Sequence, residues 1–138
     1  MKFISSMKYF SLFLMVVFLS CQDKTEPTRE KVIQHEDLIY ANFRFVADLG
    51  DEKWEELQSG THNKITPQYL DDIIYVSQLV DVNACGNYIG DIEIKKDSLY
   101  LICKITSEEV CASMALYKTT YIIKNPKMKK YKMAVKYE

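Results

Sequence analysis

The sequence lacks the short motifs that mark common catalytic and nucleotide-binding sites. It has no G-x-S-x-G nucleophile elbow, no H-E-x-x-H zinc motif, no P-loop and no G-x-G-x-x-G turn. Adjacent acids occur at positions 55–56, 71–72 and 108–109. They are no ready acid–base pair, because neighbouring side chains on a strand or helix point apart. The sequence therefore predicts no catalytic residue.

Histidine is also scarce, and no C-x-x-C pair is present. The two histidines, His35 and His62, lie in polar stretches away from any cysteine. A protein metal site needs several converging ligands. We therefore expect solvated surface histidines, no metal site and no other cofactor.

Glycine and proline number only 4 and 3, against 10 tyrosines and 6 phenylalanines. This balance predicts an ordered domain rather than a disordered chain. Lysine and arginine total 18 and the acids 19, so charge is nearly balanced. Because nucleic-acid binding requires a strong positive excess, this composition argues against a nucleic-acid partner.

One hydrophobic run stands out near the N-terminus. Residues 10–19 are apolar except for Ser11, and Lys2 and Lys8 precede or adjoin them. The run is shorter than the ~20 apolar residues that a membrane-spanning helix requires, but it suits the core of a signal peptide. The small residue Ser20 then stands directly before Cys21, as a cleavage site requires.

The last four residues of this segment are Phe18, Leu19, Ser20 and Cys21. They resemble the lipobox of bacterial lipoprotein precursors in its permissive form, with bulky apolar residues at the first two places. The resemblance covers residues 1–21 only. It implies cleavage before Cys21, a thioether-linked diacylglycerol on its sulfur and N-acylation. Since two or more acyl chains anchor a protein stably, it also implies an exported protein that is held in a membrane.

The remaining chain divides into a tether and one domain. Residues 22–31 contain no apolar side chain and include Pro27, which is typical of a linker. We therefore predict a signal peptide over residues 1–20, a lipidated tether over 21–31 and a single β-rich domain over 32–138. The charged residues after Cys21 are similar to the tethers of surface-exported lipoproteins in some Gram-negative bacteria, so we expect the outer membrane or cell surface if the source is Gram-negative.

Hydrophobic alternation predicts a mainly β domain. Residues 38–49 favour a strand, with a helix as the alternative, because apolar positions 39, 41, 43, 45, 47 and 49 share one face. A short helix is expected over 51–58, with Trp54 and Leu57 packing on the core. Thr66 and Pro67 suggest a helical turn over 67–72, followed by a strand over 73–83 or by a longer helix.

The second half favours strands throughout. A hairpin is expected over residues 87–106, turning at positions 96–97, followed by strands over 114–124 and 130–137. We interpret these four strands as an antiparallel meander covered by the first half. In the last strand Tyr131, Met133, Val135 and Tyr137 face inward and Lys130, Lys132 and Lys136 outward, as at a sheet edge.

These patterns predict a small antiparallel β-sandwich or barrel with one or two short helices. An α+β fold is the alternative.

Three cysteines remain after lipidation, and export places them where disulfides persist. Cys103 shares the buried face of its strand, so we predict a core residue. Cys85 and Cys111 flank the open end of the hairpin, so we predict a bridge between them. It would close a loop of about 26 residues, worth roughly 3–4 kcal/mol.

Two hypotheses for function follow. The first is a non-enzymatic lipoprotein of the cell envelope that binds a protein partner or a small ligand, or serves structurally. The second is a small envelope hydrolase that uses loop acids such as Asp48, Asp51 or Glu52.

The C-terminal segment is basic, with lysines at 124, 127, 129, 130, 132 and 136. These lysines could rest on anionic lipid headgroups.

The lipobox predicts the outcome of replacing its cysteine. Cys21→Ser removes the thiol that accepts the diacylglycerol, so the precursor should stay unlipidated and heavier than the processed protein. Metabolic labelling with a fatty-acid probe, followed by mass measurement, tests this. Equal label in the wild type and the variant would show the lipobox interpretation to be wrong.

Overall fold

The computed structural model describes residues 34–58 and 64–138 of the chain. The predicted signal peptide and the whole predicted tether, including Cys21, lie outside the described residues, as does His62. Within the described ranges no helix is long and apolar enough to cross a membrane.

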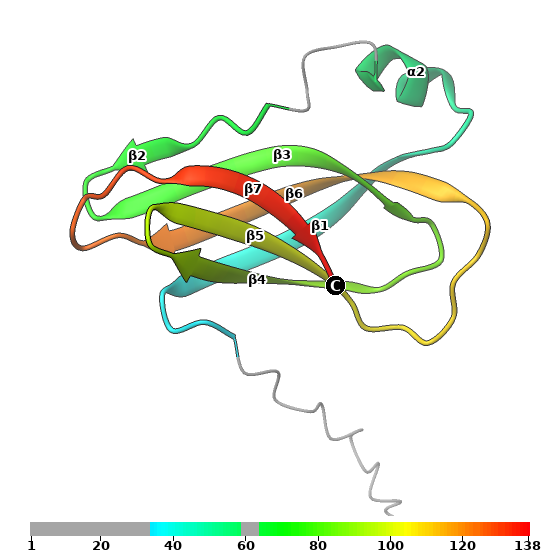
Figure 1. Ribbon diagram of the computed structural model, residues 1–138. Helices are drawn as coiled ribbons and strands as arrows, with labels where there is room; N and C mark the ends of the chain where they lie inside the picture. Colours follow the sequence, from blue (N-terminus) through cyan, green and yellow to red (C-terminus); the bar gives the residue numbers. More distant parts are fainter. Residues whose placement is uncertain (1–33, 59–63) are drawn as a thin grey trace, which may run out of the picture. The chain divides into compact units, whose positions relative to one another are not determined.

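The described part is built from two β-sheets and one short helix (Figure 1). In chain order the elements are β1 (Leu38–Asp48), α2 (Glu52–Gln58), β2 (Gln68–Leu70), β3 (Ile73–Asn83), β4 (Tyr88–Lys95), β5 (Ser98–Ile105), β6 (Met114–Lys124) and β7 (Lys132–Tyr137). Sheet A has the strand order β1-β6-β3-β2, and sheet B has the order β4-β5-β7.

The predicted mainly β class is confirmed, and the strands form two sheets of a sandwich rather than a closed barrel. The alternation of apolar and polar residues predicted most of the strands correctly. In β3, for example, Ile74, Val76, Val80 and Val82 are buried, while the residues between them are more exposed. The hairpin of β4 and β5 pairs as predicted, with Lys95 opposite Ser98 across a two-residue turn.

The helical turn predicted over residues 67–72 is wrong. Residues Gln68–Leu70 form β2, which pairs antiparallel with β3 so that Leu70 lies opposite Ile73. Asp71 in the connecting turn adopts a φ of 49°, a left-handed conformation that aspartate tolerates. The Tyr69 hydroxyl also accepts a hydrogen bond of 3.0 Å from the backbone N–H of Tyr131. These tertiary pairings outweigh the local Thr–Pro signal.

The predicted meander of the last four strands is also wrong. Strand β6 lies between β1 and β3 in sheet A, and β7 runs parallel to β5 in sheet B. The chain crosses between the sheets in the loop that follows β6. Buried Asn125 organises this loop, because its side chain donates to the Lys129 carbonyl (3.1 Å) and accepts from the Lys129 N–H (3.0 Å). A chain that changes sheet in this way can approach β5 in the parallel direction.

Strand β7 lies at the edge of sheet B, as predicted. Tyr131 and Met133 pack against one core cluster and Val135 against another, although all three are only half-buried. Tyr137, which we expected to face inward, is 57% exposed. It is the last residue of β7 and lies beyond Val135, the last residue of the strand that packs against the core.

Two irregularities in β1 explain why its predicted inner face is only partly correct. The register with β6 shifts between Leu38 and Tyr40 and again between Phe45 and Ala47. Each shift interrupts the period of two, and Ile39, which lies within the first shift, is about half-exposed. Phe45, just before the second shift, is also about half-exposed, although its ring contacts that of Tyr117. Leu49, just past the strand, is exposed as well. The expected inward positions 41, 43 and 47 are buried or half-buried.

The core lies between the sheets. Its main cluster joins Ile74, Val76, Tyr121 and Ile123 of sheet A to Ile92, Leu99 and Leu101 of sheet B. Strand β4 lies close against β1 at Gly90. A Cβ atom there would lie 2.4 Å from the Ala41 Cβ and 3.0 Å from the Tyr121 ring, so only glycine fits without displacement.

Gly90→Ala should therefore lower the free energy of unfolding by about 1–3 kcal/mol, the usual cost of overpacking a core. Urea unfolding followed by circular dichroism measures the change. Ala41→Gly in the same chain removes the closer clashing atom, so the double variant should be more stable than the sum of the two single changes predicts. Strict additivity of the two changes would contradict this account.

Candidate functional site

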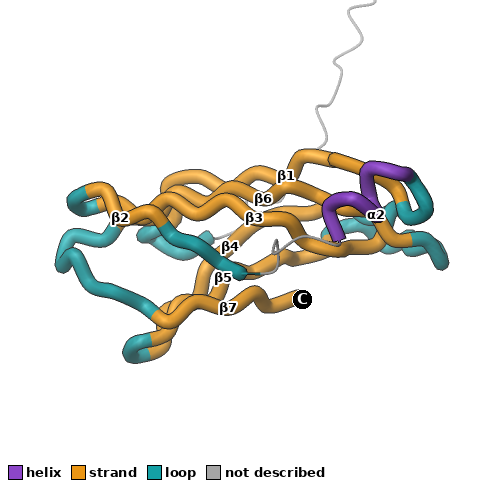
Figure 2. The backbone as a smooth tube through the Cα atoms, turned by 90° about the horizontal axis from the view of Figure 1, so that it is seen from above, coloured by secondary structure: helices purple, strands orange, loops and turns teal. Residues whose placement is uncertain are grey.

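A groove of about 680 Å³ lies on the outer face of sheet A. It is bounded by sheet A on one side and by α2 and the segment before β2 on the other; Figure 2 shows α2 lying over this sheet. Its lining residues are Arg44, Val46, Lys53, Leu57, Lys64, Thr66, Gln68, Tyr75, Ser77, Gln78, Leu79 and Lys118. The volume falls within the range of small-molecule sites.

The period of two in the strands creates the floor of the groove. Because Ile74 and Val76 of β3 point into the core, Tyr75, Ser77 and Leu79 point to the opposite face. In the same way, β6 directs Tyr121 into the core and exposes Lys118.

Helix α2 forms one wall of the groove. Lys53 and Leu57 are four residues apart on α2, so they share one side of the helix, and both line the groove. Trp54 and Leu57 are half-buried, but neither belongs to the core clusters of the described part, contrary to our expectation.

Among the described residues, four cations line the groove and no carboxylate does. They come from four separate segments: Arg44 from β1, Lys53 from α2, Lys64 from the stretch before β2, and Lys118 from β6. Among the described residues none of the four takes part in a recorded ion pair. The groove therefore carries an uncompensated positive charge.

Two of these cations are direct neighbours. Arg44 and Lys118 are cross-strand partners in the register of β1 and β6, and both side chains are exposed. Like charges directly opposite each other destabilise a sheet. A second, smaller hollow of about 170 Å³ shares this pair and adds the polar side chains of Asn42 and Thr120.

The floor of the groove also contains an unsatisfied hydroxyl. The Ser77 Oγ is buried and has no hydrogen-bond partner in the described part of the chain. A buried polar atom without a partner carries a desolvation cost. Rotation of the Ser77 side chain toward the groove would allow a ligand oxygen to accept the hydrogen bond that Ser77 leaves unmade.

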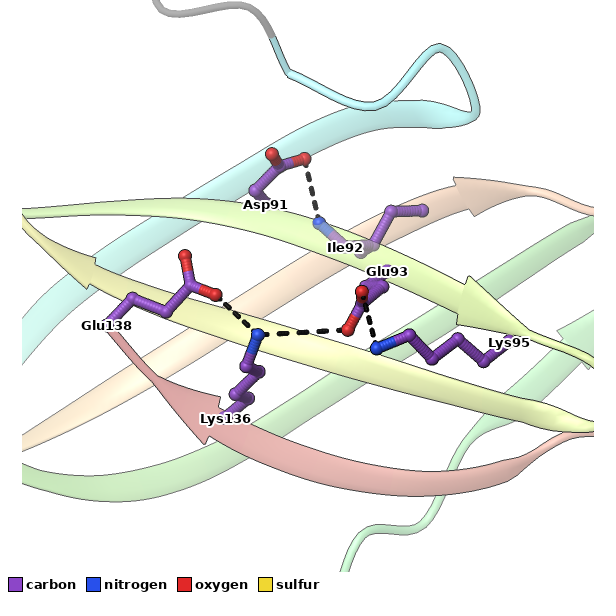
Figure 3. Close-up of polar contacts among 6 residues, drawn as sticks. All are labelled: Asp91, Ile92, Glu93, Lys95, Lys136 and Glu138. Atoms are coloured by element: carbon purple, nitrogen blue, oxygen red, sulfur yellow. Dashed lines mark hydrogen bonds and ion pairs between the residues drawn. The ribbon is translucent and has the colours of Figure 1, made fainter.

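On sheet B, in contrast, charged side chains of opposite sign form ion pairs with one another (Figure 3). Glu93 pairs with Lys95 at 2.8 Å, and Lys136 contacts both Glu138 (2.6 Å) and Glu93 (3.8 Å). The hydrogen bond from Lys95 lowers the pKa of Glu93, and the bond to Glu138 raises the pKa of Lys136. These charges neutralise one another on the surface, whereas those of the groove do not.

The basic C-terminal segment is partly neutralised as well. Lys129 pairs with Asp97 at 2.8 Å and lowers the pKa of that carboxyl. The Lys130 ammonium lies 3.6 Å from the centre of the Tyr69 ring. These contacts leave fewer lysines available to a lipid surface than the sequence suggested.

The loop acids of the hydrolase hypothesis do not converge on the groove. Asp48, Asp51 and Glu52 are exposed, and none of them lines it. The Asp51 carboxylate instead accepts the backbone N–H of Asp48 at 3.0 Å, which joins the end of β1 to the start of α2.

His35 makes a local contact rather than a metal site. Its Nδ1 accepts the backbone N–H of Asp37 at 3.1 Å. Within the described ranges no group of three or more histidine, cysteine and acidic side chains could hold a metal ion.

The predicted disulfide is present. Cys85 and Cys111 are bonded, with their Cα atoms 5.7 Å apart. Asn83 supports the bridge, because its Oδ1 accepts the backbone N–H groups of both cysteines at 3.1 Å and its amide donates to the Cys111 carbonyl.

Cys103 is free and buried, as predicted, and burial raises the pKa of its thiol. Because the thiolate is the reactive form, Cys103 is a packing residue rather than a nucleophile.

Comparisons with protein-family models, with curated proteins and with solved structures gave no match to this chain. The proposed function is therefore based on the geometry of the groove.

The cation pair predicts an unusual response to mutation. Lys118→Gln removes the repulsion with Arg44, so it should raise the free energy of unfolding by about 0.2–1 kcal/mol, and by less at high salt. Lys95→Gln is the matched control, because it breaks an ion pair and should not stabilise. Thermal unfolding of both variants at two salt concentrations tests this; a destabilised Lys118→Gln protein would mean that Lys118 has a favourable partner.

Proposed function

We propose that this protein is an exported bacterial lipoprotein, held in the membrane by the lipidated Cys21, whose β-sandwich is a non-enzymatic binding domain for an anionic ligand. One observation supports the binding role: in the described part of the chain, the 680 Å³ groove is lined by four cations and by no carboxylate. Structural surface charges are normally mixed in sign, as on sheet B. An anion in the groove would supply the missing counter-charges.

The anchor places this domain at the bacterial envelope. The positively charged start, the short apolar run and the Ser20–Cys21 pair support export and lipidation together. The polar tether of residues 22–31 would hold the domain close to the membrane surface. The membrane is then a partner through the lipid, and the ligand is a separate partner through the groove.

Binding is favoured over hydrolysis by the placement of the acids. A hydrolase of this kind requires carboxylates that converge on a substrate site. Asp48, Asp51 and Glu52 lie outside the lining of the groove, and the cations inside it provide charge rather than a general base.

The binding role is tested with the mature lipoprotein, purified with its lipid in neutral detergent. Dextran sulfate should bind, with an affinity that falls as salt is added, and uncharged dextran of the same length should not. The double variant Arg44→Gln/Lys118→Gln should weaken binding about tenfold, because hydrogen bonds to charged groups are lost.

The control removes two exposed lysines from the other sheet, as Lys104→Gln/Lys132→Gln, and lowers the net charge equally. Its affinity should stay near that of the wild type. An equal loss in both double variants would show general charge attraction and would contradict a binding role for the groove.

A further inference from the structure

The outward residues around the cation pair form a compact set of donors on three neighbouring strands. One row across sheet A contains Arg44, Lys118 and Leu79, and the adjacent row contains Asn42, Thr120 and Ser77. Neighbouring strands lie about 4.8 Å apart, and rows two residues apart are separated by about 7 Å. The donors of both rows can therefore reach a single group placed between them.

The chemistry of these donors fits a tetrahedral oxyanion. A guanidinium offers a planar fork of N–H groups, an ammonium offers three donors, and the hydroxyls of Ser77 and Thr120 add one each. A carboxylate carries one charge and is already satisfied by one arginine fork. A phosphate or sulfate group has more terminal oxygens, and a phosphate dianion balances two cations.

The unpartnered Ser77 hydroxyl is an independent indication. Its Oγ is buried on the groove floor without a partner in the described ranges, one row from the Arg44–Lys118 pair. If the Ser77 side chain rotates toward the groove, a terminal oxygen of a bound group accepts this hydrogen bond, and the negative charge of that group also relieves the repulsion between the two cations. The same ligand then removes both unfavourable features of this sheet surface.

The groove extends beyond this donor set. Toward α2 it is lined by apolar Val46, Leu57 and Leu79, together with Lys53 and Lys64. A free inorganic ion would leave that part unfilled, whereas an ester with a larger organic group would occupy it.

We infer that Arg44, Lys118 and Ser77 form a subsite for the phosphate or sulfate group of an ester whose organic part lies in the groove toward α2. This inference rests on the proposed binding function and adds the class of ligand and its orientation.

Isothermal titration of the mature lipoprotein in neutral detergent, with inorganic phosphate, sulfate and acetate as probes, tests the subsite. Phosphate or sulfate should bind at least tenfold more tightly than acetate. Phosphate stronger than sulfate assigns a phosphate ester, and the reverse order assigns a sulfate ester. Acetate equal to both would overturn the inference.

Variants locate the bound group. Lys118→Gln should weaken phosphate binding about tenfold and Ser77→Ala severalfold, while Lys95→Gln and Ser98→Ala on sheet B should leave it unchanged. Circular dichroism confirms that each variant is folded. Unchanged phosphate affinity in folded Ser77→Ala would remove Ser77 from the subsite and overturn the inference.

The dextran sulfate experiment separates this inference from the proposed function. If dextran sulfate binds through the groove but acetate equals phosphate, the subsite is wrong and the binding role stands. If neither dextran sulfate nor any small anion binds, both are wrong.

Discussion

A single buried tyrosine joins the two layers of the sandwich. Tyr121 lies on β6, inside sheet A, is fully buried, and donates a hydrogen bond of 2.8 Å to the Ile102 carbonyl of sheet B. Burial raises the pKa of Tyr121 far above its ordinary value, so the hydroxyl keeps the proton that it donates. The glycine at position 90 provides the space for its ring. Because side chains alternate along β6, a Tyr121 that points inward also requires Lys118 and Thr120 to point outward. The core contact and the groove floor thus have the same origin.

Local pattern predicted the strands, and long-range pairing decided the topology. Alternation states which face of a strand is buried, but it does not state which strand lies beside it. The limits of β3 and β6 were therefore predictable, whereas the position of β6 between β1 and β3 was not. Strand β2 was missed because three residues are too few to show a period, and its stability depends on pairing with β3. The exposed side of β1 was predicted only in part for a similar reason, because a bulge is defined by the pairing of the strand with its partner and not by the sequence of the strand alone.

Of the features described for the candidate site, some were predictable from the sequence and others were not. The disulfide was predictable because Cys85 and Cys111 flank one hairpin, so that local geometry brings them together. The groove was not predictable, because its cations come from four separate segments of the chain. These segments become neighbours only through the pairing of the strands and the position of α2. Arg44 was recognisable as an outward residue of its strand, but nothing local indicated that Lys118 would be its neighbour. The sequence drew attention instead to the lysine-rich C-terminus, where Lys129 and Lys136 have acidic partners.

In the proposed binding role, the placement of charge, rather than the total charge, would give the groove its selectivity. The chain has a formal net charge of −1, and loss of Lys2 and Lys8 with the signal peptide would make it −3. At distances beyond a Debye length of about 8 Å an anion meets a weakly repulsive protein. Within the groove it meets four cations that take part in no ion pair within the described ranges, whereas several charges of sheet B are paired. A ligand of the proposed kind would therefore gain binding energy only when its charged group enters the groove, so that both its shape and its charge would have to match. Diffuse attraction to any anionic surface would instead require an excess of positive charge, which this chain does not have.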